Sequence, residues 1–225
     1  MAAQTRISPA PVLHEDPRSG NCYKIRLTAG LLQQPLQRRQ YDILKGETRT
    51  PEFLGQVNVN GRIPVLQVDA EGGWRFLAES NAACFFLAED SALVPQDRFD
   101  RAEMLRWMFF EQNHHEPNIA TLRLWLAFIG EDNLSDLQRA QIPAKRAAGE
   151  EALDAMERHL AMRDWFAGSR ASLADVALYA YTSVCDEGGF SLAAYPNIGR
   201  WLERVESLPD YVPWGRLANV TQSPI

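Results

Sequence analysis

The spacing of hydrophobic residues divides the chain into a first part that mixes strand and helix patterns and a second part with helix patterns alone. Short alternating or apolar runs indicate strands, and apolar positions that recur every three or four residues indicate amphipathic helices. Up to residue 90 the predicted order is strand, helix, strand, helix, strand, strand, helix. These elements are predicted over residues 11–15, 21–34, 36–44, 50–56, 63–68, 74–78 and 80–89.

Beyond residue 97 the strand signals end. Helices are predicted over residues 101–130, 135–162, 172–181 and 197–208. The third opens with S-L-A-D, in which Ser172 and Asp175 have the spacing of a capping box. We therefore expect an α+β chain with a βαβαββα domain and then an all-α helical-bundle domain. The expected limits are a flexible arm at 1–10, the first domain at 11–90, a linker at 91–97 and the second domain at 98–225.

The charge of the chain argues against one large class of partner. The 225 residues have a formal net charge of −6 and no block of Lys or Arg, whereas a protein that neutralises phosphates needs the opposite sign. Nucleic acid is therefore not an expected partner. No apolar run is long enough to span a membrane, and the first residues lack the apolar region of a signal peptide. We expect a cytoplasmic protein with no membrane partner.

Cysteine and histidine usage favours neither disulfides nor metal. The three cysteines are too few and too scattered for a disulfide framework or a four-ligand zinc site; they are Cys22, Cys84 and Cys185. His114 and His115 are adjacent, and adjacent side chains on a helix point in different directions. No metal is therefore expected.

The stretch R-S-G-N-C-Y-K-I-R-L, residues 18–27, places Ser19 three residues before Cys22. It has the form of a redox C-x-x-C motif whose first cysteine is a serine. Ser19 is open to two interpretations, a hydroxyl that acts on a sulfur or a cap for the first helix, and Asn21 is open to the same two. Cys22 falls at an apolar position of the helix, where cysteine usually behaves as a small buried hydrophobe. A reactive Cys22 is the less favoured alternative.

Four stretches together resemble the cytosolic glutathione transferase superfamily. They are S-G-N-C-Y-K-I-R-L, N-V-N-G-R-I-P-V-L, L-A-E-S-N-A-A-C-F-F-L-A and S-L-A-D-V-A-L-Y-A-Y. The resemblance covers nearly the whole chain and is to bacterial members with a Ser, Thr or Asn near the first helix. It implies a thioredoxin-like first domain, glutathione as co-substrate and a homodimer. Val59 departs from the pattern, because the family more often has a proline there.

The resemblance also implies which residues bind the glutamyl and cysteinyl parts of glutathione. The Ile63–Pro64 peptide, with its proline in cis, would pair its backbone with the cysteinyl unit as an added strand does. Glu79 would pair with the ligand's ammonium. Ser80, at the start of a helix, would bind the α-carboxylate through the hydroxyl and the unpaired N–H groups.

Other residues are expected at the sulfur and at the glycine end. A hydroxyl or amide donor favours the thiolate form of a thiol, so Ser19 or Asn21 is the expected catalytic residue. The positions of Thr48 and Arg62 match sites near the glycyl part, although either is also compatible with plain surface.

The second substrate is expected to lie against the first long helix of the all-α domain. Its pocket residues would be Arg106, Trp107, Phe110 and His114, but an aromatic stripe of this kind also occurs in cores. The expected function is conjugation of glutathione to small hydrophobic electrophiles. The alternatives are a glutathione-dependent disulfide-bond oxidoreductase or peroxidase, and a non-catalytic binding or scaffolding protein of the same fold.

Overall fold

The computed structural model describes residues 10–214, which form two compact units. Unit 1 contains residues 10–84 and 212–214, and unit 2 contains residues 85–211. The division falls before the predicted linker at 91–97, and nothing in the hydrophobic pattern indicated that residues 212–214 return to unit 1. The domain limits given above stay predictions, and the expected arm at 1–10 lies, except for Ala10, outside the described residues.

Unit 1 is built on a four-stranded sheet with the strand order β2-β1-β3-β4. β1 (Val12–Glu15) runs parallel to β2 (Gln37–Gln40) and antiparallel to β3 (Val65–Ala70). β4 (Gly73–Ala78) pairs antiparallel with β3. The hairpin turn expected in D-A-E-G-G is present, with Gly72 at a φ of 94°, a left-handed value that glycine adopts without steric cost.

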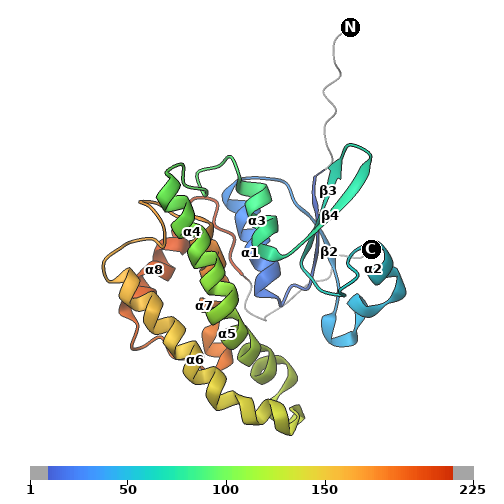
Figure 1. Cartoon of the computed structure of the whole chain (residues 1–225). Helices are drawn as coiled ribbons and strands as arrows, with labels where there is room; N and C mark the ends of the chain where they lie inside the picture. Colours follow the sequence, from blue (N-terminus) through green and yellow to red (C-terminus); the bar gives the residue numbers. More distant parts are fainter. Residues whose placement is uncertain (1–9, 215–225) are drawn as a thin grey trace. The chain divides into compact units, whose positions relative to one another are not determined.

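Three helices complete the thioredoxin-like pattern. α1 (Gly20–Leu31) connects the parallel strands, as a parallel pair requires, α2 (Pro51–Gln56) precedes β3, and α3 (Ser80–Ala88) follows β4. Figure 1 shows α1 and α2 on opposite sides of the sheet. The order βαβαββα confirms the predicted fold class of the first part of the chain.

The second strand is shorter than the sequence pattern predicts. β2 ends at Gln40 rather than at Leu44 because Asp42 turns the chain. Its Oδ1 atom accepts a hydrogen bond from the Leu44 N–H at 3.0 Å and starts a 3-10 turn, η1 (Ile43–Lys45). A second turn, η2 (Glu47–Arg49), follows directly and leads to α2.

Unit 2 contains helices and turns but no strand among its residues 85–211. The α-helices are α4 (Arg98–Phe110), α5 (Glu116–Arg123), α6 (Asp136–Leu160), α7 (Leu173–Thr182) and α8 (Pro196–Glu206). Two π-helical segments, η3 (Glu111–His115) and η4 (Leu124–Ile129), and two 3-10 turns, η5 (Glu131–Asn133) and η6 (Cys185–Gly188), lie between them. The predicted all-α second part is confirmed (Figure 1).

The single helix predicted over residues 101–130 is wrong in detail, because η3 and η4 interrupt it. Pro117 lies in the first turn of α5. Proline has no N–H to donate to the carbonyl four residues earlier, so the α-helical bonding pattern fails at Asn113. A π-helical segment is one way in which a helix accommodates such a break.

Helix α7 is the centre of unit 2, with every one of its residues buried. The predicted capping box is present at its start, where the Ser172 N–H and Oγ donate to Asp175 Oδ2 at 2.9 and 3.0 Å. The other carboxylate oxygen of Asp175 accepts from the Phe166 N–H at 3.1 Å and from the Trp201 indole Nε1 at 2.9 Å. Asp175 therefore joins the cap to α8 and has a folding role.

Candidate functional site

Unit 1 brings the starts of two helices together. The Oγ hydroxyl of Ser80, at the first position of α3, donates to Asn21 Oδ1 in the first turn of α1 at 3.3 Å. The same Asn21 oxygen accepts from Lys24 Nζ at 2.7 Å. Helix starts carry unpaired N–H groups and a partial positive charge, so this place is suited to an anionic ligand.

Ser19 occupies the N-cap position of α1. Its backbone is extended, and its Oγ atom accepts from the Cys22 N–H at 3.4 Å. This contact agrees with the interpretation of Ser19 as a cap for the first helix. It does not exclude the other interpretation, because a hydroxyl that accepts one hydrogen bond still has its own proton to donate.

Cys22 is fully buried in α1, and burial raises the pKa of its thiol to about 12. The thiolate is the reactive form of cysteine, so this side chain is not suited to nucleophilic chemistry at neutral pH. Any reactive sulfur at this end of α1 therefore has to come from a ligand.

The residues expected around the rest of glutathione lie in unit 1, directly before β3 and at the start of α3. The Ile63–Pro64 peptide is cis, as the resemblance implies, and lies directly before β3. Glu79 is exposed and has a φ of 71°, in the left-handed region that residues other than glycine rarely adopt. Ser80 is only 5% exposed. Glu79 and Ser80 are thus consecutive residues at the start of α3, the first exposed and the second buried.

The two residues proposed for the glycine end differ in burial. Thr48, in η2, is 3% exposed, whereas Arg62 is exposed and its carbonyl accepts from Asn58 Nδ2 at 2.9 Å. Contact of Thr48 and Arg62 with the glycyl part stays a prediction.

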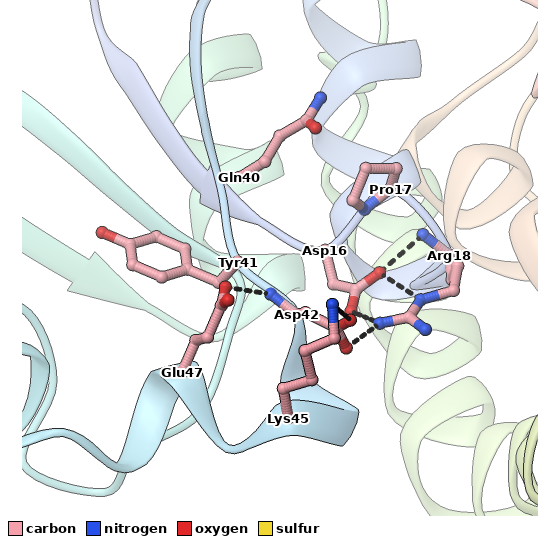
Figure 2. A pocket seen from close by; sticks show the side chains of 8 residues that line it. All are labelled: Asp16, Pro17, Arg18, Gln40, Tyr41, Asp42, Lys45 and Glu47. Atoms are coloured by element: carbon pink, nitrogen blue, oxygen red, sulfur yellow. Dashed lines mark hydrogen bonds and ion pairs between the residues drawn. The ribbon is translucent and has the colours of Figure 1, made fainter. Parts of the chain in front are cut away.

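A cavity of about 250 Å³ lies beside the loop that carries Ser19 (Figure 2). Its walls come from that loop, from the end of β2 and from the following turns; they are Asp16, Pro17, Arg18, Gln40, Tyr41, Asp42, Lys45 and Glu47. The sequence pattern did not single out these residues, because D-P-R-S-G has the composition of an ordinary turn. The one available signal was the density of charge just before Ser19.

The expected pocket residues of the second substrate fall partly in the core of unit 2. Trp107 is 3% exposed, and its ring packs edge-on against His159 and Phe166 with centroids 4.8 and 4.7 Å apart. Arg106 is exposed and forms an ion pair with Glu103 at 2.7 Å. For Trp107 the structure therefore favours the core interpretation.

Phe110 and His114 lie nearer the surface of the same segment. Phe110 is half-buried, and the exposed His114 stacks on it with ring centroids 5.4 Å apart. The neighbouring His115 is buried, with Nε2 and Thr182 Oγ1 2.9 Å apart. The two histidines therefore do not face a common point.

Among residues 10–214 no three His, Cys, Asp or Glu side chains are grouped in a way that could hold a metal ion. In the same part of the chain, no helix combines the length and the apolar character needed to cross a membrane.

Comparisons with known proteins show the family to which the chain belongs. Residues 119–209 match the family model for the glutathione S-transferase C-terminal domain. A solved structure of a possible glutathione S-transferase from Rhodopseudomonas palustris is 40% identical, with a TM-score of 0.85 over 96% of this chain and 94% of that one. A glutathione S-transferase structure from Pseudomonas fluorescens is 43% identical, with a TM-score of 0.83 over 92% and 99%.

A curated relative carries a different functional name. The disulfide-bond oxidoreductase YfcG of Escherichia coli is 28% identical over 203 residues, which cover 84% of this chain and 87% of that protein. The fold, the family-model match and the identity to solved transferases over nearly their whole length lead to one conclusion. The chain belongs to the cytosolic glutathione transferase superfamily.

Proposed function

We propose that the protein is a glutathione transferase that binds glutathione in unit 1, stabilises its thiolate and adds the sulfur to a small electrophile. The observation that carries the proposal is the hydrogen bond between Ser80 Oγ and Asn21 Oδ1, which are 3.3 Å apart. This bond links the starts of α3 and α1. Glutathione has an α-carboxylate on its glutamyl unit and a thiol on the next residue. Two adjacent helix starts can bind these two groups, the carboxylate at α3 and the thiol at α1.

The glutamyl unit is proposed to bind at α3. Its α-carboxylate accepts from the N–H groups at the start of the helix and from the Ser80 hydroxyl, which turns its single proton from Asn21 Oδ1 to the ligand. Its ammonium pairs with the exposed Glu79 carboxylate. The backbone of Ile63 beside Pro64 pairs with the cysteinyl unit. Thr48 and Arg62 complete the proposed site at the glycine end.

The thiol is proposed to lie at the start of α1. A free cysteine thiol has a pKa of about 8.5 and is mostly protonated at neutral pH. A charge-assisted hydrogen bond contributes about 1.5–3 kcal/mol, and one pKa unit corresponds to about 1.4 kcal/mol. One donor from Ser19 or Asn21 therefore lowers the thiol pKa by about one to two units.

The electrophile is proposed to contact α4 and η3 through Arg106, Phe110 and His114, with Trp107 as the buried support of that wall. The aromatic faces would bind an apolar ring, and Arg106 would favour a substrate that develops negative charge. The assembly is proposed to be a homodimer, as the family resemblance implies.

A second candidate function is reduction of disulfides with glutathione, and the relative named disulfide-bond oxidoreductase favours it. In that reaction one glutathione thiolate attacks the disulfide, forms a mixed disulfide and displaces one thiolate. A second glutathione thiolate attacks the glutathione sulfur of the mixed disulfide, forms glutathione disulfide and displaces the other thiolate. Both sulfurs come from the ligands, so the burial of Cys22 is compatible with this chemistry.

The first experiment measures glutathione binding by calorimetry and the thiolate of the bound ligand by ultraviolet absorbance across pH. Wild type should bind glutathione with a thiol pKa about one to two units below 8.5. Ser19→Ala should return the thiol pKa toward its free value and lower kcat for chlorodinitrobenzene, with binding retained through Glu79 and Ser80. If Asn21→Ala does this and Ser19→Ala does not, Asn21 is the donor.

The second measurement separates the two activities. Rates with an aryl halide and with a mixed disulfide of glutathione are compared in the same preparation. Faster turnover of the aryl halide supports the transferase, and faster turnover of the disulfide supports the oxidoreductase. Binding without either reaction would identify a non-catalytic member of the superfamily, and no binding would contradict the whole proposal.

A further inference from the structure

The loop before Ser19 is held by an unusually complete set of hydrogen bonds to one buried carboxylate. The side chain of Asp16 is fully buried. Its Oδ1 atom accepts from the backbone N–H and from Nε of Arg18, both at 2.9 Å, and its Oδ2 atom accepts from Arg18 Nη2 at 2.6 Å and from the Ile43 N–H at 3.2 Å. A buried carboxylate is tolerated when its oxygens are satisfied in this way.

The backbone of Asp16 is bonded to Ser19, and its carboxylate is connected to a distant turn. The Ser19 N–H donates to the backbone carbonyl of Asp16 at 2.9 Å. Arg18 Nη2 also donates to Asp42 Oδ1 at 2.5 Å, and the Asp42 N–H donates to Glu47 Oε2 at 2.7 Å. Figure 2 shows the Arg18 guanidinium joined by dashed lines to the carboxylates of both Asp16 and Asp42.

We infer that Asp16, Arg18 and Asp42, together the clamp, are positioning residues that fix the Ser19 hydroxyl at the sulfur and join its loop to the turn that carries Thr48. The inference rests on the proposed function. The three residues of the clamp lie outside the stretches that resemble the family, and they act through Ser19 rather than through contact with the ligand.

Two physical arguments support positioning over other roles. A catalytic donor has to be held within about 0.5 Å of its productive place. The N-cap contacts hold Ser19 on the side of α1, and the loop on its other side needs a support of its own. The clamp supplies this support from two elements that are far apart in the sequence. The charge of Arg18 is compensated by two aspartates, so the clamp carries no excess positive charge with which to attract the thiolate directly.

Because of this charge balance, Asp16→Asn can distinguish a charge effect from a positioning effect. The two effects would shift the thiol pKa of bound glutathione in opposite directions. Asp16→Asn removes a negative charge near the sulfur, which by charge alone would lower the thiol pKa of bound glutathione. If the clamp acts by positioning, the same substitution disorders the loop, because an amide has one acceptor oxygen where the carboxylate had two. The thiol pKa should then rise.

The experiment titrates the thiolate absorbance of bound glutathione and measures kcat and KM across pH. Asp16→Asn and Arg18→Gln should each raise the bound thiol pKa by about one unit, a tenfold loss of thiolate below that pKa. The loss in kcat/KM should disappear above the shifted pKa. KM for glutathione should change little, because Glu79 and Ser80 are untouched.

The control variants remove the same charges, one positive and one negative, at residues outside the clamp. Arg39 and Glu52 form an exposed pair in unit 1 at 4.0 Å, so Arg39→Gln and Glu52→Gln should leave the thiol pKa at the wild-type value. Asp42→Asn serves if Asp16→Asn does not fold, because Asp42 is 27% exposed and the contacts between Asp16 and Arg18 persist. It should raise the pKa by a smaller amount.

The outcomes separate the inference from the proposed function. A wild-type protein that does not lower the thiol pKa of glutathione overturns both. A wild-type protein that lowers it, with folded clamp variants of unchanged pKa, overturns the inference alone. A lower pKa in Asp16→Asn, or a loss of rate equal at every pH, also overturns it, because the first indicates a charge effect and the second general loss of structure.

Discussion

Glu79 has a backbone conformation that only glycine adopts without cost. Its φ is 71°, and a residue with a side chain in such a region costs about 1–3 kcal/mol. Residues of this kind persist where the surrounding structure holds them, and they concentrate at ligand sites. At Glu79 the proposed contact between its carboxylate and the ammonium of glutathione explains why a charged residue stands where glycine would be more stable.

Because of this conformation, we expect glycine at position 79 to give a more stable protein than alanine, the reverse of the usual order. Both Glu79→Gly and Glu79→Ala remove the carboxylate, so both should bind glutathione more weakly. The glycine variant should nevertheless be about 1 kcal/mol more stable than the alanine variant, because alanine keeps a Cβ atom at positive φ. Urea unfolding measures the difference. An alanine variant that is the more stable of the two would mean that the backbone relaxes, and undiminished binding would remove Glu79 from the site.

At the residue scale, the sequence predicted what depends on near neighbours. Ser19 and Cys22 could be placed as a cap and a buried side chain because both follow from the periodicity of α1 itself. Asp16 could not be recognised, because its importance depends on the Ile43 N–H and, through Arg18, on Asp42. Contacts between such distant positions are set by the pairing of β1 with β2, which one sequence does not reveal.

The packing of α6 depends on a glycine in its interior. A Cβ atom on Gly149 would lie 2.5 Å from Cε1 and Cζ of Phe190, and Phe190 is only 4% exposed. Glycine normally costs a helix about 1 kcal/mol relative to alanine. In α6 this cost is offset, because the missing side chain lets the helix backbone approach the aromatic ring.

Two equivalent substitutions in unit 2 should therefore have opposite effects. Gly149→Ala should lower the free energy of unfolding by about 1–3 kcal/mol through overpacking against Phe190. Gly199→Ala in α8 should raise it by about 0.5–1 kcal/mol, because a Cβ atom there meets nothing within 4 Å. Chemical denaturation of both variants checks the pair. A stabilised Gly149→Ala protein would show that the ring moves away at little cost.

Element types were predictable wherever the pattern was regular, and the errors fall where a single residue interrupts it. The apolar spacing over 101–130 continues through Pro117, so the pattern predicts one helix although the backbone bonding changes to π-helical. Likewise, the alternation over 36–44 continues past Gln40, and only the capping contact of Asp42 shows that the strand has ended.

In the molecule as a whole, the family-model match and the proposed glutathione site lie in different units. The family model matches residues 119–209, inside unit 2. The proposed residues Ser19, Asn21, Ile63, Glu79 and Ser80 all belong to unit 1. The fold class of both parts was predictable, because the change from mixed to purely helical periodicity extends over many residues. The proposed location of the glutathione site in unit 1 calls for a test of its own.

Hydrogen exchange with and without glutathione provides that test. A ligand that binds only the folded state stabilises it by about 2.7 kcal/mol at a concentration of 100 times Kd. Amides of unit 1 that exchange through its unfolding should slow by about a hundredfold under these conditions. The protection should include the backbone at Ile63 and the first turn of α3, where the cysteinyl and glutamyl units are proposed to bind.

The control ligand is cysteinylglycine, which keeps the thiol and the glycine end of glutathione but lacks the glutamyl group. It should protect the first turn of α3 much less, and Ser80→Ala should reduce the protection by glutathione at the same amides. Equal protection by both ligands would mean that the start of α3 does not bind the glutamyl unit. Protection confined to the helices of unit 2 would place the glutathione site outside unit 1 and would contradict the assignment of Glu79 and Ser80 together.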